Sequence, residues 1–119
     1  DHAPHTLQDK ETTFDLAACG MIGLESCFGA VNKILMGNQR FKLVDLITLL
    51  TVKPRKIMGF EYDLFKKGSE AEIIVIDPEK EWVFNQENIK SKSKNSAFLG
   101  ERLIGVINYT ISKGFIGKN

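Results

Sequence analysis

The sequence has little excess charge of either sign and no long apolar run. Its 16 lysines and arginines against 15 aspartates and glutamates leave a formal net charge of +1. Such a balance gives no electrostatic attraction to nucleic acid or to an anionic membrane, so we predict neither as a partner. No apolar stretch approaches the roughly 20 residues that a membrane-spanning helix needs. The first ten residues are polar and include Asp1 and Asp9, which predicts that no signal peptide is present.

Cysteine is also scarce. The two cysteines, Cys19 and Cys27, are too far apart in sequence for a redox Cys-x-x-Cys motif. Reduced thiols of a cytosolic protein fit this usage better than a disulfide does. We therefore predict a cytoplasmic protein in which both cysteines are small packing residues.

Histidine occurs only twice in 119 residues, and both histidines lie in the first five positions. The chain opens with Asp1-His2-Ala3-Pro4-His5. A carboxylate such as that of Asp1 can hold a metal or accept a proton. An imidazole four positions later, beyond a rigid Ala-Pro step, can face the same pocket and hold an anion. The alternative interpretation is a frayed, polar N-terminus without a function.

The first half of the chain has helical periodicity after a long loop over residues 1–23. Residues 24–36 are predicted to form a helix that Gly37 and Asn38 end. Its apolar stripe consists of Phe28, Val31 and Leu35, widened by Cys27 and Ile34. Residues 41–50 are predicted to form a second helix, with Leu43, Leu46, Ile47 and Leu50 on one face. Pro54 near the start and Gly59 at the end predict a short third helix, in which Arg55 and Lys56 are solvated or dipole-facing charges.

After Gly59 the period changes from helical to extended. The β-branched run at residues 73–76 predicts a buried strand, which the Asp77-Pro78 pair ends in a turn. A second short strand is expected at residues 82–84. Residues 85–102 are predicted to be a solvated loop, and a hairpin is expected from residues 105–111 and 115–116. The second half therefore predicts four or five short strands.

Several motifs together resemble the C-terminal third of the dihydroorotases, which are cyclic amidases of the amidohydrolase superfamily. The opening Asp1–Thr6 motif is the most specific of them, since related cyclic amidases usually lack its second histidine. The other matching segments, in family order, are Lys10, Gly20-Met21-Ile22-Gly23-Leu24-Glu25, Leu50-Thr51-Val52-Lys53-Pro54, residues 68–77, residues 91–100 and residues 110–114. The resemblance covers essentially the whole chain.

The resemblance implies a (β/α)8 barrel with a small β-rich accessory domain built from both chain ends. A barrel of this kind needs roughly 250 residues, so this chain cannot close one. We expect an α+β segment in which residues 1–59 are the C-terminal part of the barrel, namely its catalytic loop and outer helices. Residues 60–119 would then supply the C-terminal strands of the accessory β domain.

The resemblance also implies an activity, the interconversion of N-carbamoyl-L-aspartate and L-dihydroorotate at a binuclear zinc centre. Asp1 would be the catalytic residue and a metal ligand, and His5 would bind the substrate carboxylate. The backbone around Ala17 and Cys19 would contact the pyrimidine ring. His2 has two possible roles, ordering the loop by hydrogen bonds or acting as a ligand.

The zinc centre of the family needs further histidines and a carboxylated lysine from earlier barrel strands. A hydrolytic zinc site commonly takes three protein ligands, so Asp1 alone cannot hold the metal. We therefore expect the chain to be inactive by itself. Its helices would leave apolar faces that need the remainder of the chain or a second copy.

Two other functions fit the residues less well. One is another cyclic amidase of the superfamily, similar to dihydropyrimidinases or allantoinases, against which His5 argues. The other is a non-catalytic homologue that serves as a scaffold, for which the resemblance suggests aspartate transcarbamoylase as the partner. Retention of both Asp1 and His5 argues against a scaffold.

Overall fold

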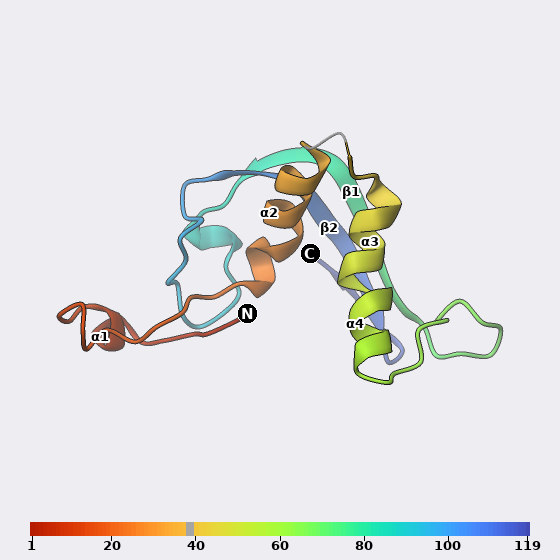
Figure 1. The fold of residues 1–119 in the computed structure, drawn as a ribbon, viewed down its shortest axis with the longest axis horizontal. Coiled ribbons are helices and arrows are strands. Elements are labelled where there is room, and N and C mark those ends of the chain that lie inside the picture. The colour runs from red at the N-terminus through yellow and green to blue at the C-terminus, as the bar shows by residue number, and fades with distance from the viewer. Residues whose placement is uncertain (38–39) are drawn as a thin grey trace.

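The computed structural model describes residues 1–37 and 40–119 (Figure 1). Its elements are, in order, α1 (Leu7–Lys10), α2 (Leu24–Met36), α3 (Leu43–Leu50), α4 (Val52–Ile57), β1 (Glu72–Val83), the 3-10 helix η1 (Gln86–Asn88), β2 (Arg102–Ser112) and β3 (Phe115–Lys118). The three strands form an antiparallel sheet in the order β1-β2-β3. Helices followed by an antiparallel sheet confirm the predicted α+β class.

The three longer helices lie close to their predicted positions. Helix α2 has the predicted bounds, although the stop predicted at Asn38 lies outside the described residues. Helix α3 begins at Leu43 rather than at residue 41, because the Asp45 carboxylate accepts a hydrogen bond from the Lys42 backbone at 2.8 Å. Helix α4 begins two residues before Pro54. Proline is tolerated there because the first turn of a helix leaves its N–H groups without helical partners.

Helix α2 packs against β2 mainly through small residues. Gly29 is buried, and a Cβ atom at its position would lie 3.1 Å from the Leu103 Cβ atom. Of the predicted stripe only Phe28 is buried, whereas Cys27 is exposed and Ile34 is 67% exposed. The stripe thus stays largely uncovered, as expected for an apolar face that needs the remainder of the chain, and the helix approaches the sheet through its glycine and alanine instead.

The sheet corrects the strand predictions. Strand β1 runs through Asp77 and Pro78, where a turn between two strands was predicted. Its pairing with β2 shifts register between Asp77 and Glu81, so Pro78 lies in a bulge where no ladder donor is required. The described chain thus has three strands instead of four or five. The predicted hairpin is confirmed as β2 and β3, with Lys113 and Gly114 both at positive φ in its turn.

The hydrophobic core lies between α2 and the end of the sheet near the segment that follows β1. Phe84, Ile22 and Leu103 are at most 1% exposed, and Ala30 and Ile89 complete this buried cluster. Trp82 and Phe98 pack against it, and the Trp82 ring meets the Phe84 ring edge-on at 5.8 Å between centroids. The core thus joins α2 to segments about 60 residues away.

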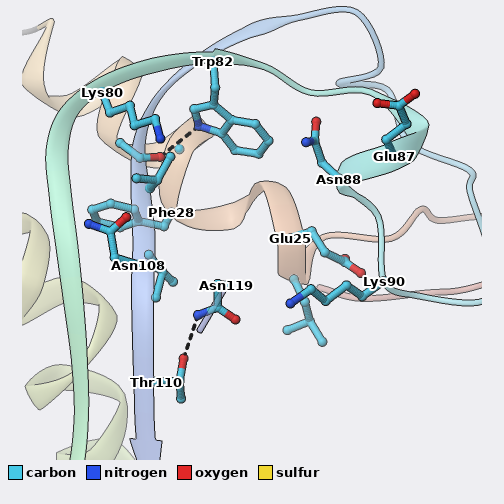
Figure 2. Close-up of a pocket in the computed structure, with 15 residues that line it drawn as sticks. Glu25, Phe28, Lys80, Trp82, Glu87, Asn88, Lys90, Asn108, Thr110 and Asn119 are labelled. Carbon is cyan, nitrogen blue, oxygen red and sulfur yellow. Dashed lines mark hydrogen bonds between the residues drawn. The ribbon is translucent and has the colours of Figure 1, made fainter. Parts of the chain in front are cut away.

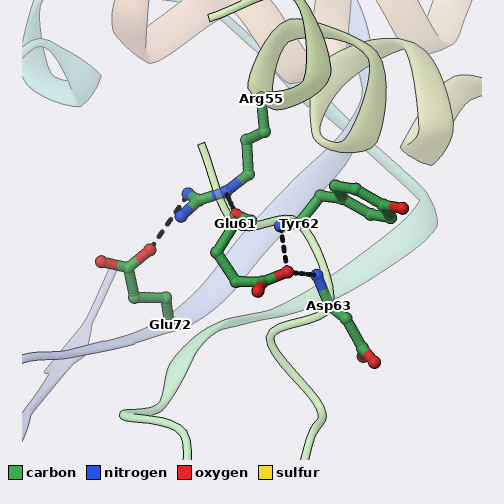
Figure 3. Close-up of polar contacts among 5 residues, drawn as sticks. All are labelled: Arg55, Glu61, Tyr62, Asp63 and Glu72. Carbon is green, nitrogen blue, oxygen red and sulfur yellow. Dashed lines mark hydrogen bonds and ion pairs between the residues drawn. The ribbon is translucent and has the colours of Figure 1, made fainter. Parts of the chain in front are cut away.

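Arg55 links α4 to the segment that follows it and to the start of β1 (Figure 3). Its Nε atom donates to the Glu61 carbonyl at 2.6 Å, and its Nη1 atom pairs with Glu72 at 3.1 Å. The Lys56 ammonium lies 4.5 Å from the centre of the Tyr62 ring. Both cations lie in the last turn of α4, where the predicted role of facing the helix dipole remains open to them, and the chain that turns back after α4 brings these further partners to them.

Large apolar side chains stay exposed along α3, α4 and the segment that follows. These elements lie on the side of the molecule away from α1 (Figure 1). They are Val44, Ile57, Met58, Phe60 and Phe65. No helix in the described part of the chain is long and apolar enough to cross a bilayer.

We expect the 119-residue chain to self-associate in solution through these side chains, since large exposed apolar patches favour association. Light scattering after size exclusion should give a mass above that of the monomer, rising with protein concentration. Replacing Ile57 and Phe65 together by lysine should lower that mass. A monodisperse, well-folded monomer at all concentrations would contradict this expectation.

Candidate functional site

The opening motif runs antiparallel to residues 19–23. The Ala3 N–H donates to the Met21 carbonyl at 2.8 Å, and the His5 Nε2 atom lies 2.7 Å from the Cys19 carbonyl oxygen. Because a carbonyl can only accept, this His5 nitrogen carries a hydrogen. The motif is therefore held along its length, which argues against a frayed terminus.

Glycine is required at position 20 of this pairing. Gly20 has φ of +101°, and a Cβ atom there would lie 2.5 Å from the Ala3 Cβ atom. At position 23 a Cβ atom would collide with the Asp1 carbonyl oxygen. The two glycines thus let the 19–23 segment approach the motif closely, both by conformation and by the absence of a side chain.

A third segment, residues 91–97, completes the site from the far end of the sequence. Ser93 Oγ donates to the His5 carbonyl at 2.8 Å and also contacts the Asn95 side chain. The Asn95 carbonyl accepts from Ile22 N–H at 2.9 Å. The three lysines at 90, 92 and 94 are exposed as predicted, but Ser93 between them contacts the motif and Ser91 contacts helix α2. The prediction of a solvated loop was therefore right for only one side of this segment.

Helix α1 was missed within the predicted loop 1–23, and it positions a lysine. Thr6 and Asp9 cap each other, since Asp9 N–H donates to Thr6 Oγ1 and Thr6 N–H to the Asp9 carboxylate. The side-chain hydrogen bond from Thr6, followed by its backbone hydrogen bond, lowers the pKa of Asp9. Lys10, in the last turn, donates to the carbonyls of Ala18 at 2.7 Å and Gly20 at 3.0 Å. The Thr-x-x-Asp spacing, similar to a capping box, is the sequence signal for this turn.

The predicted site residues all lie in the motif or in the loop beside it, but the structure does not bring all of their side chains into contact. Asp1 is exposed, and its Oδ1 atom accepts from the His2 N–H at 2.7 Å. His5 and Ala17 are half-buried, and Cys19 is exposed. In the described chain no hydrogen bond joins Asp1 to His5. An open hollow of about 560 Å³ adjoins the 19–23 segment that pairs with the motif, and it is lined by Lys10, Gly20, Met21, Asn95, Ser96, Ala97 and Leu99.

The second carboxylate oxygen of Asp1 accepts no hydrogen bond from the described residues, so its lone pairs can face a metal ion. Carboxylate oxygen is a normal ligand of zinc. Residues 1–37 and 40–119 contain no group of three or more histidine, cysteine, aspartate and glutamate side chains that could hold a metal. Among the described residues only Asp1 is thus available as a ligand for the predicted metal. A complete metal centre would need further ligands from outside this chain.

His2 caps helix α2. Its Nδ1 atom accepts from the backbone N–H groups of Gly23 at 3.1 Å and Leu24 at 3.4 Å. Helix N-termini leave such donors without helical partners, and an acceptor there stabilises the helix. Of the two roles considered for His2, these contacts support the ordering of the loop.

The identity of the accepting atom in His2 gives a test. Asn places an amide oxygen where Nδ1 lies, whereas Gln places its polar atoms near Nε2. We expect His2→Gln to lower the free energy of unfolding by about 1 kcal/mol, as for the loss of a helix cap. His2→Asn should retain most of that stability. Urea unfolding at matched protein concentrations measures both, and equal losses in the two variants would contradict the capping role.

Glu25, in the first turn of α2, holds the loop that carries Ser93 and Asn95. Its Oε1 atom accepts from Ser91 N–H at 2.7 Å and from Ser91 Oγ at 2.5 Å. Burial of Glu25 raises the pKa of its carboxyl, but the two Ser91 hydrogen bonds outweigh burial and lower it below the ordinary 4.5. The structure therefore stabilises the ionised form of this side chain.

A lowered pKa makes this contribution to stability pH-dependent. It is fully present above 4.5, the ordinary pKa, and is lost as the pH falls through the lower pKa of the folded state. We expect Glu25→Gln to reduce the loss of stability on acidification below 4.5. Urea unfolding at neutral and acidic pH would measure this, with the exposed Glu11→Gln as the control. An unchanged acid dependence in Glu25→Gln would contradict the assignment.

A larger hollow of about 620 Å³ lies between α2 and the sheet (Figure 2). Phe28 and Trp82 line it, and Trp82 Nε1 donates to the Gly105 carbonyl at 3.0 Å. Glu25 and Lys90 lie on the same side of it. The opening motif lines neither hollow, but the smaller one is lined by Asn95, which bonds to the motif, and by Lys10, which bonds to the loop paired with it, so the candidate site remains there.

Comparison with known proteins shows which proteins the chain resembles. No protein-family model matches the chain. It is 40% identical over 116 residues to a dihydroorotase of Thermoanaerobacter sp. (strain X514), and 39% identical over 114 residues to one of Elusimicrobium minutum (strain Pei191). A dihydroorotase of Caldicellulosiruptor saccharolyticus is 40% identical over 118 residues. These matches cover 98%, 96% and 99% of this chain but only 27%, 26% and 27% of the relatives.

The chain thus spans about a quarter of the length of the curated relatives that it matches. By this similarity the chain is a homologue of the C-terminal portion of the dihydroorotases, as its motifs predicted.

Proposed function

We propose that this chain is the C-terminal part of a zinc-dependent dihydroorotase, which interconverts N-carbamoyl-L-aspartate and L-dihydroorotate. Residues 1–59 would end its barrel and residues 60–119 would complete its accessory β domain. The observation that carries the proposal is the packing of the Asp1–His5 motif on residues 19–23, in a chain similar to dihydroorotases over nearly its whole length.

In this proposal Asp1 contacts the metal and moves a proton. A bound zinc centre supplies a Lewis acid and lowers the pKa of a bound water to about 7. The Asp1 carboxylate would accept the proton of the attacking water in ring opening and return it to the departing ring nitrogen. The hydrogen bond from His2 N–H to Oδ1 orients the carboxylate and leaves the other oxygen for this transfer.

His5 would bind the carboxylate of the substrate. Its Nε2 hydrogen is already donated to the Cys19 carbonyl, so a second donor requires a hydrogen on Nδ1 as well. The imidazolium form has both, and its positive charge strengthens a hydrogen bond to an anion. The backbone of residues 17–19 would contact the ring of the substrate at the same time.

The proposal places the protein in the cytoplasm, where cysteines stay reduced. Cys19 and Cys27 are both free thiols in the structure, and both are exposed, which corrects the prediction that they are packing residues. The proposed partners are the small-molecule substrate and the remainder of the polypeptide or a second copy.

The test is a turnover assay of the complete polypeptide with zinc. We expect conversion in both directions with the two named substrates and little with dihydrouracil, hydantoin or allantoin, and none from the 119-residue chain alone. Preference for one of those other rings would instead support a different cyclic amidase. No turnover together with binding to aspartate transcarbamoylase would support the scaffold.

A further inference from the structure

Asn95 joins three separate segments of the chain. Its Oδ1 atom accepts from the His5 N–H at 3.5 Å, and its Nδ2 atom donates to the Gly20 carbonyl at 3.2 Å. Its backbone carbonyl accepts from Ile22 N–H at 2.9 Å. A half-buried amide with these contacts fixes the position of His5 relative to residues 19–23.

Lys10 acts on the same loop from the other end of the motif. It donates to the Ala18 and Gly20 carbonyls, so Lys10 and Asn95 share the Gly20 oxygen. The His5 Nε2 atom donates to the Cys19 carbonyl, which lies between the Ala18 and Gly20 carbonyls in the sequence. Three successive carbonyls of the loop are therefore turned toward donors of the chain itself.

The direction of these carbonyls sets the direction of the neighbouring amides. In a trans peptide the N–H points away from the C=O of the same peptide unit. The Cys19 N–H thus points away from the Lys10 side chain, and the Gly20 N–H away from His5. Among the residues that the structure describes, neither N–H donates to another group. Both are free to meet the acceptor oxygens of a ligand.

We infer that Asn95 and Lys10 are positioning residues of the substrate-binding loop, which turn its carbonyls inward and present the Cys19 and Gly20 amides to carbonyl or carboxylate oxygens of the substrate. This inference rests on the proposed function. It assigns to residues 91–97, in the part of the chain proposed as accessory domain, an effect on substrate affinity that acts through the 18–20 loop.

Kinetics of the complete enzyme test this inference. Asn95→Ala and Asn95→Asp both remove the donor to Gly20, and Lys10→Met removes the other one. Each should raise KM about tenfold or more, since a lost hydrogen bond misplaces the loop, while kcat changes by less than about threefold. Lys10→Arg keeps a donor and should restore most of the affinity. Lys92→Ala, an exposed change in the same segment as Asn95, is the matched control.

Amide hydrogen exchange at Ala18, Ile22 and Gly23, whose N–H groups are hydrogen-bonded, separates the inference from the proposed function. Exchange should be about tenfold faster in Asn95→Ala and in Lys10→Met than in Lys92→Ala. Faster exchange with unchanged KM would overturn the role in substrate binding, and unchanged exchange would overturn the positioning itself. If Asn95→Ala does not fold, the Lys10 variants decide both points. A wild-type enzyme that lacks dihydroorotase turnover would end the proposed function, and exchange would still decide whether these residues position the loop.

Discussion

Asp1→Asn in the complete enzyme is expected to lower kcat by a factor of about 10² to 10⁴, the usual contribution of a general acid–base group. Asparagine keeps an Oδ1 atom to accept from His2 N–H, so the motif should keep its geometry. It cannot take up a proton and is a poorer metal ligand than a carboxylate. Steady-state kinetics in both directions, with metal content measured in parallel, would check this.

The control for Asp1 is Asp15→Asn, which removes an exposed carboxylate from the same N-terminal region. It should leave turnover and thermal unfolding unchanged. Near-normal turnover in Asp1→Asn with full metal content would contradict the proton-transfer role. Normal turnover only after excess zinc is added would limit Asp1 to metal binding.

His5→Ala is expected to raise KM by about 10- to 100-fold, the cost of one charge-assisted hydrogen bond to a carboxylate, with a smaller change in kcat. The contacts of His5 suggest a second variant. His5→Gln places an amide nitrogen near the Nε2 position and can keep the bond to Cys19, but it has no positive charge.

Together the two variants separate the charge of His5 from its structural contact. A similar rise in KM for Ala and Gln would assign the effect to the charge. A near-normal KM in His5→Gln would instead assign the effect to the hydrogen bond that positions the Cys19 loop. Gln8→Ala, an exposed change in the same segment, is the control. Unchanged KM for both substrates in His5→Ala would contradict carboxylate binding.

The sequence predicted the three longer helices well because a helix is signalled by apolar residues three or four positions apart within the helix itself. Leu43, Leu46 and Ile47 recur at helical spacing, and Lys113-Gly114 lies at the turn of a confirmed hairpin. The α+β class followed from the change of period after Gly59. Tertiary packing decided what local patterns could not, such as the continuation of β1 through Pro78, where a bulge absorbs the missing donor.

The candidate site was predicted in part. The motif itself identified Asp1 and His5, and their roles remain predictions. The contribution of Ser93 and Asn95 was missed because it depends on contacts between residues about 90 positions apart. One signal was available: charged and small polar residues alternate from Ser91 to Asn95, which indicates two faces of an extended segment. Only the solvent-facing lysines were considered.

The contact between residues 91–97 and the opening motif has a consequence for engineering. A chimera that takes residues 1–59 from one relative and residues 60–119 from another would pair the opening motif with a 91–97 segment from a different protein. Compatibility at positions 93 and 95 would then decide whether the hybrid keeps its affinity. Such a chimera should keep its substrate affinity when Ser93 and Asn95 come from the same relative as the Asp1–His5 motif, which they contact.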